Sequence, residues 1–233
     1  MMDRSRFGAD VLEWELPVSV VDALLVDHAV GKAWHNIRWC TKDYERYGIG
    51  FGEKLISHDT PFGIGTDPGA SKRGSIKVFE HSGKGHDVVL YQIERGKRKV
   101  SYVSKDGILK NASDVAPIKV FIPEAYGAGE NFPHQILGQP ELAPQNSVCT
   151  QSYLYVTFGQ QKEAKNFVGY LKTKFFRALV LAAKITQHAQ APVYRFVPVQ
   201  DFSEPWDDAK LYKKYKLTRE EIAFIESMIK PME

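Results

Sequence analysis

The sequence predicts an α+β protein: a curled, mixed or antiparallel β-sheet of short strands, braced by a long amphipathic helix and followed by a small C-terminal helical extension. Two observations predict this fold class. Six short runs of alternating apolar and polar residues, with turn signals between them, lie between residues 75 and 198, and this pattern is typical of strands. One later stretch repeats its apolar residues at the period of a helix instead.

The first half of the chain is predicted to run from helix to loop to strands. Residues 18–36 place apolar side chains at helical spacing after Ser19, a plausible N-cap. Residues 57–74 are dense in Gly, Pro, Asp and Ser, which predicts a loop. The strands are expected at residues 75–80, 87–93, 99–104, 117–123, 152–158 and 193–198.

The last third of the sequence predicts three helices. The long amphipathic helix is expected over residues 163–187, where one continuous apolar stripe includes Phe167, Leu171 and Phe175. Asp207 can cap a short helix that runs through Tyr215. Thr218 and Glu221 then have the T-x-x-E spacing of a capping box before IAFIESMI, which predicts a final helix.

Composition restricts the class of protein more than it indicates a function. Hydrophobic residues make up 43% and charged residues 25% of the 233 residues, which is typical of a globular protein. No apolar run reaches the roughly 18 residues that a membrane span needs. The two cysteines, Cys40 and Cys149, have no CxxC spacing, so we expect a reduced cytoplasmic protein. The net charge of +3 is only weak evidence for a polyanionic partner.

Catalytic patterns are missing from the sequence. The glycine-rich segments at 48–52, 63–66 and 127–130 lack the preceding buried strand and following helix of a nucleotide loop, so turns are the favoured interpretation. The seven histidines lack metal-ligand spacing, so no metal site is expected. Asp87, Glu94 and Lys97 faintly resemble the carboxylate–carboxylate–lysine set of magnesium-dependent nucleases. Two residues separate the Glu from the Lys where that set has one, which favours a surface hairpin.

Several predicted loops have a composition suited to recognition. The segments SHDTPFG, KDGILKN, YGAGENFPHQ and KITQHAQ mix small residues with Asn, Gln, His and Lys, whose side chains can reach base edges or phosphates. Solvent-facing turns have the same composition, so from the residues alone both interpretations stay open.

A set of strings resembles one known family. These strings are LISHDTPFG (55–63), SIKVFEHSGK (75–84), YVSKDGILKN (102–111), IKVFIPEAYGAGENFPHQIL (118–137), SVCTQSYLYV (147–156), EAKNFVGYLKTKFFRALVLAAKITQH (163–188), VYRFVPVQDFSEPWDDAKLYKKYKLT (193–218) and REEIAFIESMIKP (219–231). In order and spacing the chain, from about residue 55 onward, resembles the C-terminal target-recognition region of type II restriction–modification proteins that carry an adenine-specific DNA methyltransferase domain. The first 50 residues match poorly.

The resemblance implies a division of labour between this chain and a catalytic domain. In that family the catalytic half comes first and holds S-adenosylmethionine and an Asn/Asp-Pro-Pro-Tyr motif for the flipped adenine. This chain has no Pro-Pro pair, so we expect no catalytic residues and no cofactor here, and a fragment or a separately encoded specificity module. The expected parts are an N-terminal helical lead-in from a missing catalytic domain (1–50), a DNA target-recognition domain (51–200) and a C-terminal helical extension (201–233).

The expected partners are double-stranded DNA and a methyltransferase catalytic domain, in cis or as a separate subunit, with no membrane. Loop side chains would read bases, while helix cations and Arg195 would attract phosphates. The aspartate in His58-Asp59-Thr60-Pro61, where relatives carry a basic residue, would repel phosphate. The candidate DNA-binding residues are His58, Thr60, Arg73, Lys110, Asn111, Tyr126, His134, Gln135, Lys172, Arg177, Thr186, Gln187, His188 and Arg195.

Two other functions remain open from the sequence. A stand-alone type II restriction endonuclease would use Asp87, Glu94 and Lys97 with magnesium. A protein-interaction module would dock to a methyltransferase without contacting bases.

Overall fold

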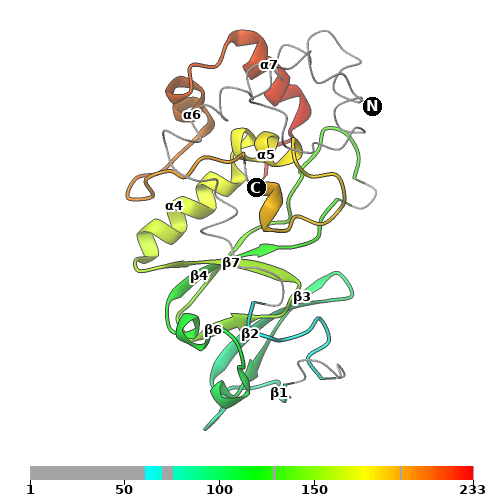
Figure 1. Cartoon of the computed structure of the whole chain (residues 1–233), viewed down its shortest axis with the longest axis vertical. Helices are drawn as coiled ribbons and strands as arrows, with labels where there is room; N and C mark the ends of the chain where they lie inside the picture. The colour runs from blue at the N-terminus through cyan, green and yellow to red at the C-terminus, as the bar shows by residue number, and fades with distance from the viewer. Residues whose placement is uncertain (1–60, 70–75, 128–129, 195, 233) are drawn as a thin grey trace.

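The protein is built from two β-sheets and a group of helices stacked in layers, as the computed structural model shows (Figure 1). The structure describes residues 61–69, 76–127, 130–194 and 196–232. The strands are β1 (Val78–Phe79), β2 (Val88–Glu94), β3 (Lys97–Val103), β4 (Ile118–Pro123), β5 (Glu141–Ala143), β6 (Ser147–Cys149) and β7 (Tyr153–Phe158). The helices are α4 (Gln161–Lys172), α5 (Lys174–Leu181), α6 (Asp208–Lys214) and α7 (Arg219–Met228), with short 3₁₀ turns η2 (Lys105–Gly107), η3 (Ala112–Val115) and η4 (Ala191–Tyr194).

The strands confirm the predicted α+β class but form two sheets. The first sheet has the order β1-β3-β2-β6, in which the β2–β6 pair is parallel and the other pairs are antiparallel. The second sheet has the order β5-β4-β7 and is antiparallel throughout. The expectation of one curled sheet is therefore corrected to two open sheets, and the short strands β5 and β6 were missed by the sequence pattern.

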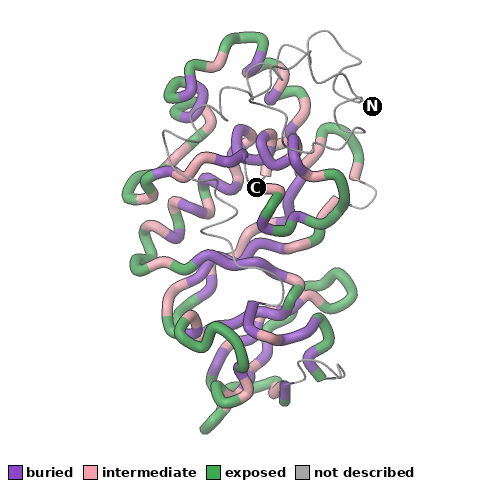
Figure 2. Tube along the Cα trace, in the orientation of Figure 1, coloured by how far each residue is buried: buried purple, intermediate pink, exposed green. Residues whose placement is uncertain are grey.

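The second sheet is the middle layer, covered on both faces. Along β4, the side chains of Val120 and Ile122 join the core formed with the helices, whereas Phe121 between them joins the core formed with the first sheet. The same alternation holds on β7, where Leu154 faces the helices and Tyr155 faces the first sheet. Because successive strand side chains point to opposite faces, strands of this layer are almost wholly buried (Figure 2).

Residues 193–198 do not form the predicted strand. Their first residues belong to η4, and the backbone N–H of Val197 then donates to the carbonyl of Tyr194 at 3.0 Å. Pro192 directly precedes the segment and Pro198 ends it. Proline has no backbone N–H to donate to a neighbouring strand, so both residues disfavour strand pairing there. The alternating apolar residues are still buried, since Tyr194 and Val197 lie in the core beneath the helices.

The predicted helix over residues 163–187 is interrupted and shorter than expected. Thr173 adopts an extended conformation, with ψ of 148°, between α4 and α5, and the last helical residue is Leu181. The Thr173 hydroxyl caps α5 by accepting from the N–H of Phe176 at 3.2 Å. The carboxylate of Asp208 accepts from the N–H groups of Lys174 and Phe175, at 3.0 and 2.8 Å. Together these acceptors stabilise a new helix start that the unbroken apolar stripe conceals.

The C-terminal helices begin where the sequence predicts. The Asp207 side chain accepts from the N–H of Lys210 at 2.7 Å and caps α6. Thr218 and Glu221 form the reciprocal capping box of α7. The predicted helix over residues 18–36 lies outside the described residues, as do residues 57–60 and 70–74 of the predicted loop; its described part, residues 61–69, contains neither helix nor strand.

Arg177 is a structural residue rather than a surface cation. Its side chain is fully buried, and its guanidinium donates to four backbone carbonyl groups. These belong to Lys172 (3.0 Å), Thr173 (3.2 Å), Gln135 (3.1 Å) and Lys230 (2.9 Å). Burial lowers the pKa of Arg177 to about 10. The expectation that Arg177 attracts phosphate is thus corrected, because its donors are already committed inside the protein.

In the described part of the chain, none of the helices has the length and apolarity required to cross a membrane.

Replacing Arg177 tests its structural role. Arg177→Met would remove the guanidinium donor from the carbonyl groups of Lys172, Gln135 and Lys230, so we expect the free energy of unfolding to fall by about 3 kcal/mol or more. Urea denaturation followed by circular dichroism measures this. Lys172→Met, an equivalent change in a half-buried residue of α4, is the control and should cost less than about 1 kcal/mol. Equal losses in the two variants would contradict the assignment.

Candidate nucleic-acid interface

Two loops that are distant in sequence lie side by side and contain six of the fourteen candidate residues. The β4 loop follows strand β4 and comprises residues 124–135, of which 128–129 are outside the described part. The α5 loop follows helix α5 and comprises residues 182–190. The N–H of Tyr126 donates to the carbonyl of Gln187 at 2.8 Å, and the N–H of Ala189 donates to the carbonyl of Glu124 at 2.7 Å. Backbone hydrogen bonds therefore hold the two loops together.

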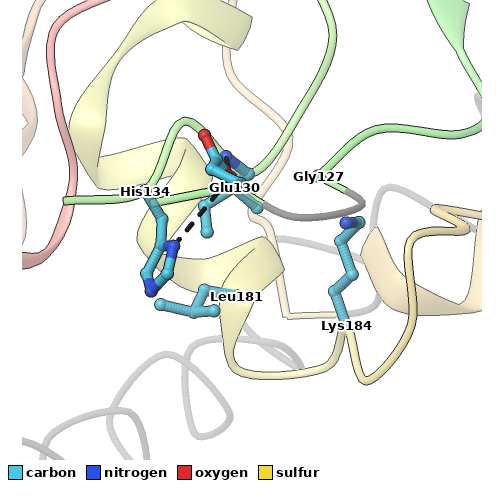
Figure 3. A pocket seen from close by; sticks show the side chains of 6 residues that line it. Gly127, Glu130, His134, Leu181 and Lys184 are labelled. Carbon is cyan, nitrogen blue, oxygen red and sulfur yellow. Dashed lines mark hydrogen bonds and ion pairs between the residues drawn. The ribbon is translucent and has the colours of Figure 1, made fainter. Parts of the chain in front are cut away.

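Glu130 organises the β4 loop from inside. Its carboxylate accepts from the N–H groups of Gln135 and Ile136, and Lys230 from beyond α7 lies 3.2 Å from it. His134 lies 4.0 Å from the same carboxylate, as Figure 3 shows. Burial alone would raise the pKa of Glu130, but the two N–H donors and Lys230 outweigh burial and hold the pKa below its ordinary value. The loop is thus folded around an ionised carboxylate.

Lys184 connects the α5 loop to the β4 loop. Its ammonium group donates to the carbonyl of Tyr126 at 2.8 Å, and burial lowers its pKa, against the opposing effect of Glu130. The pKa of Tyr126 is raised by burial and then by Glu130. Tyr126 and Lys184 are both half-buried, so they support the loops more than they present side chains to a partner.

A shallow pocket lies between these loops, but it is too small for a nucleotide. Its volume is about 150 Å³. Sites for drug-sized ligands and cofactors usually occupy about 300–1,000 Å³. The pocket is lined by Gly127, Glu130, His134, Ile136, Leu181 and Lys184 (Figure 3). Its size suits a few water molecules or one side chain of a partner.

The tips of the two loops carry exposed side chains. Thr186, Gln187 and His188 are all exposed on the α5 loop. The Nδ1 atom of His188 lies 2.9 Å from the carboxylate of Glu124, which fixes the ring. A carboxylate only accepts hydrogen bonds, so Nδ1 carries a proton in this contact, and the Nε2 atom of the neutral ring is then an acceptor beside the Gln187 amide.

Large apolar side chains are exposed at the same place. Phe132 on the β4 loop is 62% exposed and Ile185 on the α5 loop is 54% exposed. The ring of Phe132 meets the ring of His134 edge-on, with 5.7 Å between their centroids. Exposed apolar side chains beside polar ones are a common feature of binding surfaces. We call the exposed residues Phe132 and Ile185 to His188, together with the half-buried His134, the paired-loop surface.

Lys110 and Asn111 belong to another part of the molecule. The Asn111 side chain donates to the carbonyl of Pro61 at 2.6 Å, and its backbone has a φ of 48°. The neighbouring Ile108 and Val115 are buried with the first sheet, whereas Ile136 and Leu137, directly after the β4 loop, are buried with the helices. Lys110, exposed beside Gly63, and Asn111 thus accompany the described end of the loop predicted at residues 57–74.

The remaining candidates do not present their side chains with these groups. Gln135 lies in the β4 loop, but its side chain donates to the carbonyl of Leu137 at 2.8 Å. Lys172 is half-buried at the end of α4, and its carbonyl accepts from Arg177. His58, Thr60, Arg73 and Arg195 lie outside the described residues.

The nuclease alternative does not fit the geometry of β2. Asp87 directly precedes the strand and Glu94 ends it, so the two carboxylates lie at opposite ends of a strand of 7 residues, about 20 Å long. Glu94 pairs with Lys99 at 2.8 Å, and Asp87 contacts the Asn146 amide. The ranges that the structure describes contain no cluster of three His, Cys, Asp or Glu side chains able to hold a metal ion. The geometry therefore argues against the alternative in which Asp87, Glu94 and Lys97 form one metal centre, and the favoured surface hairpin agrees with the pairing of β2 and β3.

The sequence did not reveal the residues that shape the paired-loop surface. Glu124, Glu130, Lys184 and Lys230 all hold the loops, yet each is a single charged residue in an ordinary context. Their partners lie 5 to 100 positions away, and no local spacing indicates such contacts.

Comparison of the chain with protein-family models, with curated proteins and with solved structures found no match.

The ionised state of Glu130 predicts a pH-dependent contribution to stability. Because its pKa is lower in the folded protein than the ordinary 4.5, the stabilisation is present above that value and is lost as the pH falls through the lowered pKa. Glu130→Gln should reduce the free energy of unfolding by about 1–3 kcal/mol at pH 7. In urea denaturation this deficit should shrink as the pH approaches 3. A pH-independent deficit, or an equal one in the α4 control Glu163→Gln, would contradict this role.

Proposed function

We propose that this chain is the sequence-specific DNA recognition module of a type II restriction–modification enzyme that methylates adenine. The observation that carries the proposal is the paired-loop surface. Two of the loops that the sequence singled out as recognition loops come together, their backbones bonded to each other and their polar side chains exposed. The resemblance to target-recognition regions supports the same conclusion independently.

The chemistry of the paired-loop surface suits base reading. The Gln187 amide has one donor and one acceptor that complement the N7 acceptor and N6 donor of adenine in the major groove. His188 and Thr186 supply further hydrogen-bonding groups. The exposed ring of Phe132 can contact a thymine methyl group or a base face. Since backbone hydrogen bonds and the Lys184 ammonium hold the two loops together, these side chains are positioned before DNA arrives.

The reactive groups are proposed to lie in a methyltransferase domain, supplied in cis or by a partner subunit. That domain would bind S-adenosylmethionine and the flipped adenine, and the complex would act on DNA in the cytoplasm. The small pocket beside Glu130 suits this division, because a methyl donor of nucleoside size would not fit in about 150 Å³.

Docking to a protein is the second candidate function, and Phe132 and Ile185 favour it. Apolar side chains that are 62% and 54% exposed resemble the centre of a protein interface more than a phosphate-binding surface. Two results together would establish docking instead. The chain would fail to retard a random duplex at low salt, and it would bind an adenine methyltransferase domain in an interaction that Phe132→Ser abolishes.

Selection of bound duplexes from a random pool tests base reading. The wild-type chain, with a methyltransferase domain added if required, should enrich one sequence. We expect Gln187→Ala to relax the preference at one position, by about 1–3 kcal/mol, without changing binding to random duplex. Gln161→Ala, an exposed glutamine on α4, is the matched control. No enriched sequence with the wild-type chain would contradict the proposed function.

A further inference from the structure

Strands β2 and β3 form a hairpin with a tight, well-defined turn. Arg95 and Gly96 occupy the turn with positive φ of 50° and 76°, and Glu94 and Lys97 face each other across it. Two central residues of positive φ are typical of the type I′ turn, whose twist matches that of paired antiparallel strands. The hairpin is therefore a regular two-stranded element up to its tip.

The outer part of the hairpin extends beyond its neighbours in the sheet. Strand β6 pairs only with residues 89–91 of β2, and β1 pairs only with residues 102–103 of β3. Among the described strands, residues 92–99 pair only with each other, and we call them the β2–β3 ribbon. From Glu94 to Lys99 every residue of the ribbon is exposed. The ribbon thus projects from the sheet, at the right of Figure 1.

The ribbon is strongly cationic at its tip. Arg95, Lys97, Arg98 and Lys99 lie there with a single acid, Glu94, which pairs with Lys99 at 2.8 Å. In the part of the chain that the structure describes, no carboxylate lies within 4.0 Å of the charged groups of Arg95 and Lys97. These two cations are unneutralised and face solvent, as a phosphate-binding group requires.

Side-chain contacts at both ends of the ribbon hold it in place. The buried Gln92 amide donates to the Ser101 hydroxyl at 2.7 Å across the two strands. Arg98 donates to the carbonyl of Gln139 and lies 3.2 Å from the carboxylate of Glu141. Residues 139–141 follow the β4 loop closely in sequence, so Arg98 connects the ribbon to the loop. The ribbon and the α5 loop also lie on the same side of the molecule in Figure 1.

We propose that the β2–β3 ribbon enters the major groove of the DNA duplex and that Arg95 and Lys97 contact its phosphates. The major groove, about 12 Å wide, accommodates a two-stranded β-ribbon. A duplex on this side of the molecule would meet the ribbon and the paired-loop surface together. This inference rests on the proposed function and adds the element that supplies non-specific affinity and orientation.

The salt dependence of binding tests the inference. The probe is a random-sequence duplex, and its affinity for the full chain is measured by fluorescence anisotropy between 50 and 200 mM salt. The slope of log K against log salt concentration is negative for such binding. We expect the double variant Arg95→Gln/Lys97→Gln to make it less negative by about 2, because two phosphate contacts are lost. Lys213→Gln/Lys216→Gln removes two exposed lysines at the end of α6 and should leave the slope unchanged. Unchanged melting temperatures verify that both double variants are folded.

A second duplex tests the groove. Glucosylated hydroxymethylcytosine fills the major groove, so this duplex should bind the wild-type chain weakly, whereas a minor-groove-binding drug should not compete. Normal binding to the glucosylated duplex, or a slope unchanged in the ribbon variant, would overturn the inference while leaving the proposed function intact. A ribbon variant that aggregates yet binds DNA as the wild type does would also overturn it, since the cations then only protect a sheet edge. Absence of wild-type binding would reject the proposed function itself.

Discussion

The hydrogen bonds of the buried Arg177 guanidinium are the interactions on which the arrangement of the helices and the β4 loop depends. The guanidinium binds carbonyl groups from the α4–α5 junction, from the β4 loop at Gln135 and from the C-terminal segment at Lys230. Those last two residues also hold Glu130, through the Gln135 N–H and the Lys230 ammonium. One buried cation and one largely buried anion thus join three separate parts of the chain, and the shape of the paired-loop surface follows from them.

The sequence was informative where structure depends on local rules. The helix starts at Asp207 and Thr218 were predicted because a cap and its target lie three residues apart. Five of the six strand predictions, near β1 to β4 and β7, overlap observed strands because alternation reports burial on a pleated surface. The same pattern failed at residues 193–198, where buried alternating residues sit in a 3₁₀ turn. Periodicity detects burial, and prolines decide here whether a strand can pair.

The paired-loop surface and the β2–β3 ribbon were predicted only in part, for a physical reason. Composition identified the β4 and α5 loops, because exposed polar side chains are visible in a sequence. It also placed Arg177 among the surface cations, since a sequence does not show that four carbonyl groups surround a guanidinium. The cations of the ribbon, by contrast, were read only as a surface hairpin. Their importance comes from the sheet order, which leaves residues 92–99 without neighbouring strands.

The backbone pairing of the two loops has an evolutionary consequence. The hydrogen bonds between them use main-chain groups of Glu124, Tyr126, Gln187 and Ala189, which any residue except proline supplies equally well on the donor side. The side chains of Thr186 and Gln187 are therefore replaceable without removing these two bonds, whereas His188 also contacts Glu124. Under the proposed function, a lineage that carries this scaffold would change its preferred target by substitutions at positions 186 and 187, while selection for folding acts on other residues.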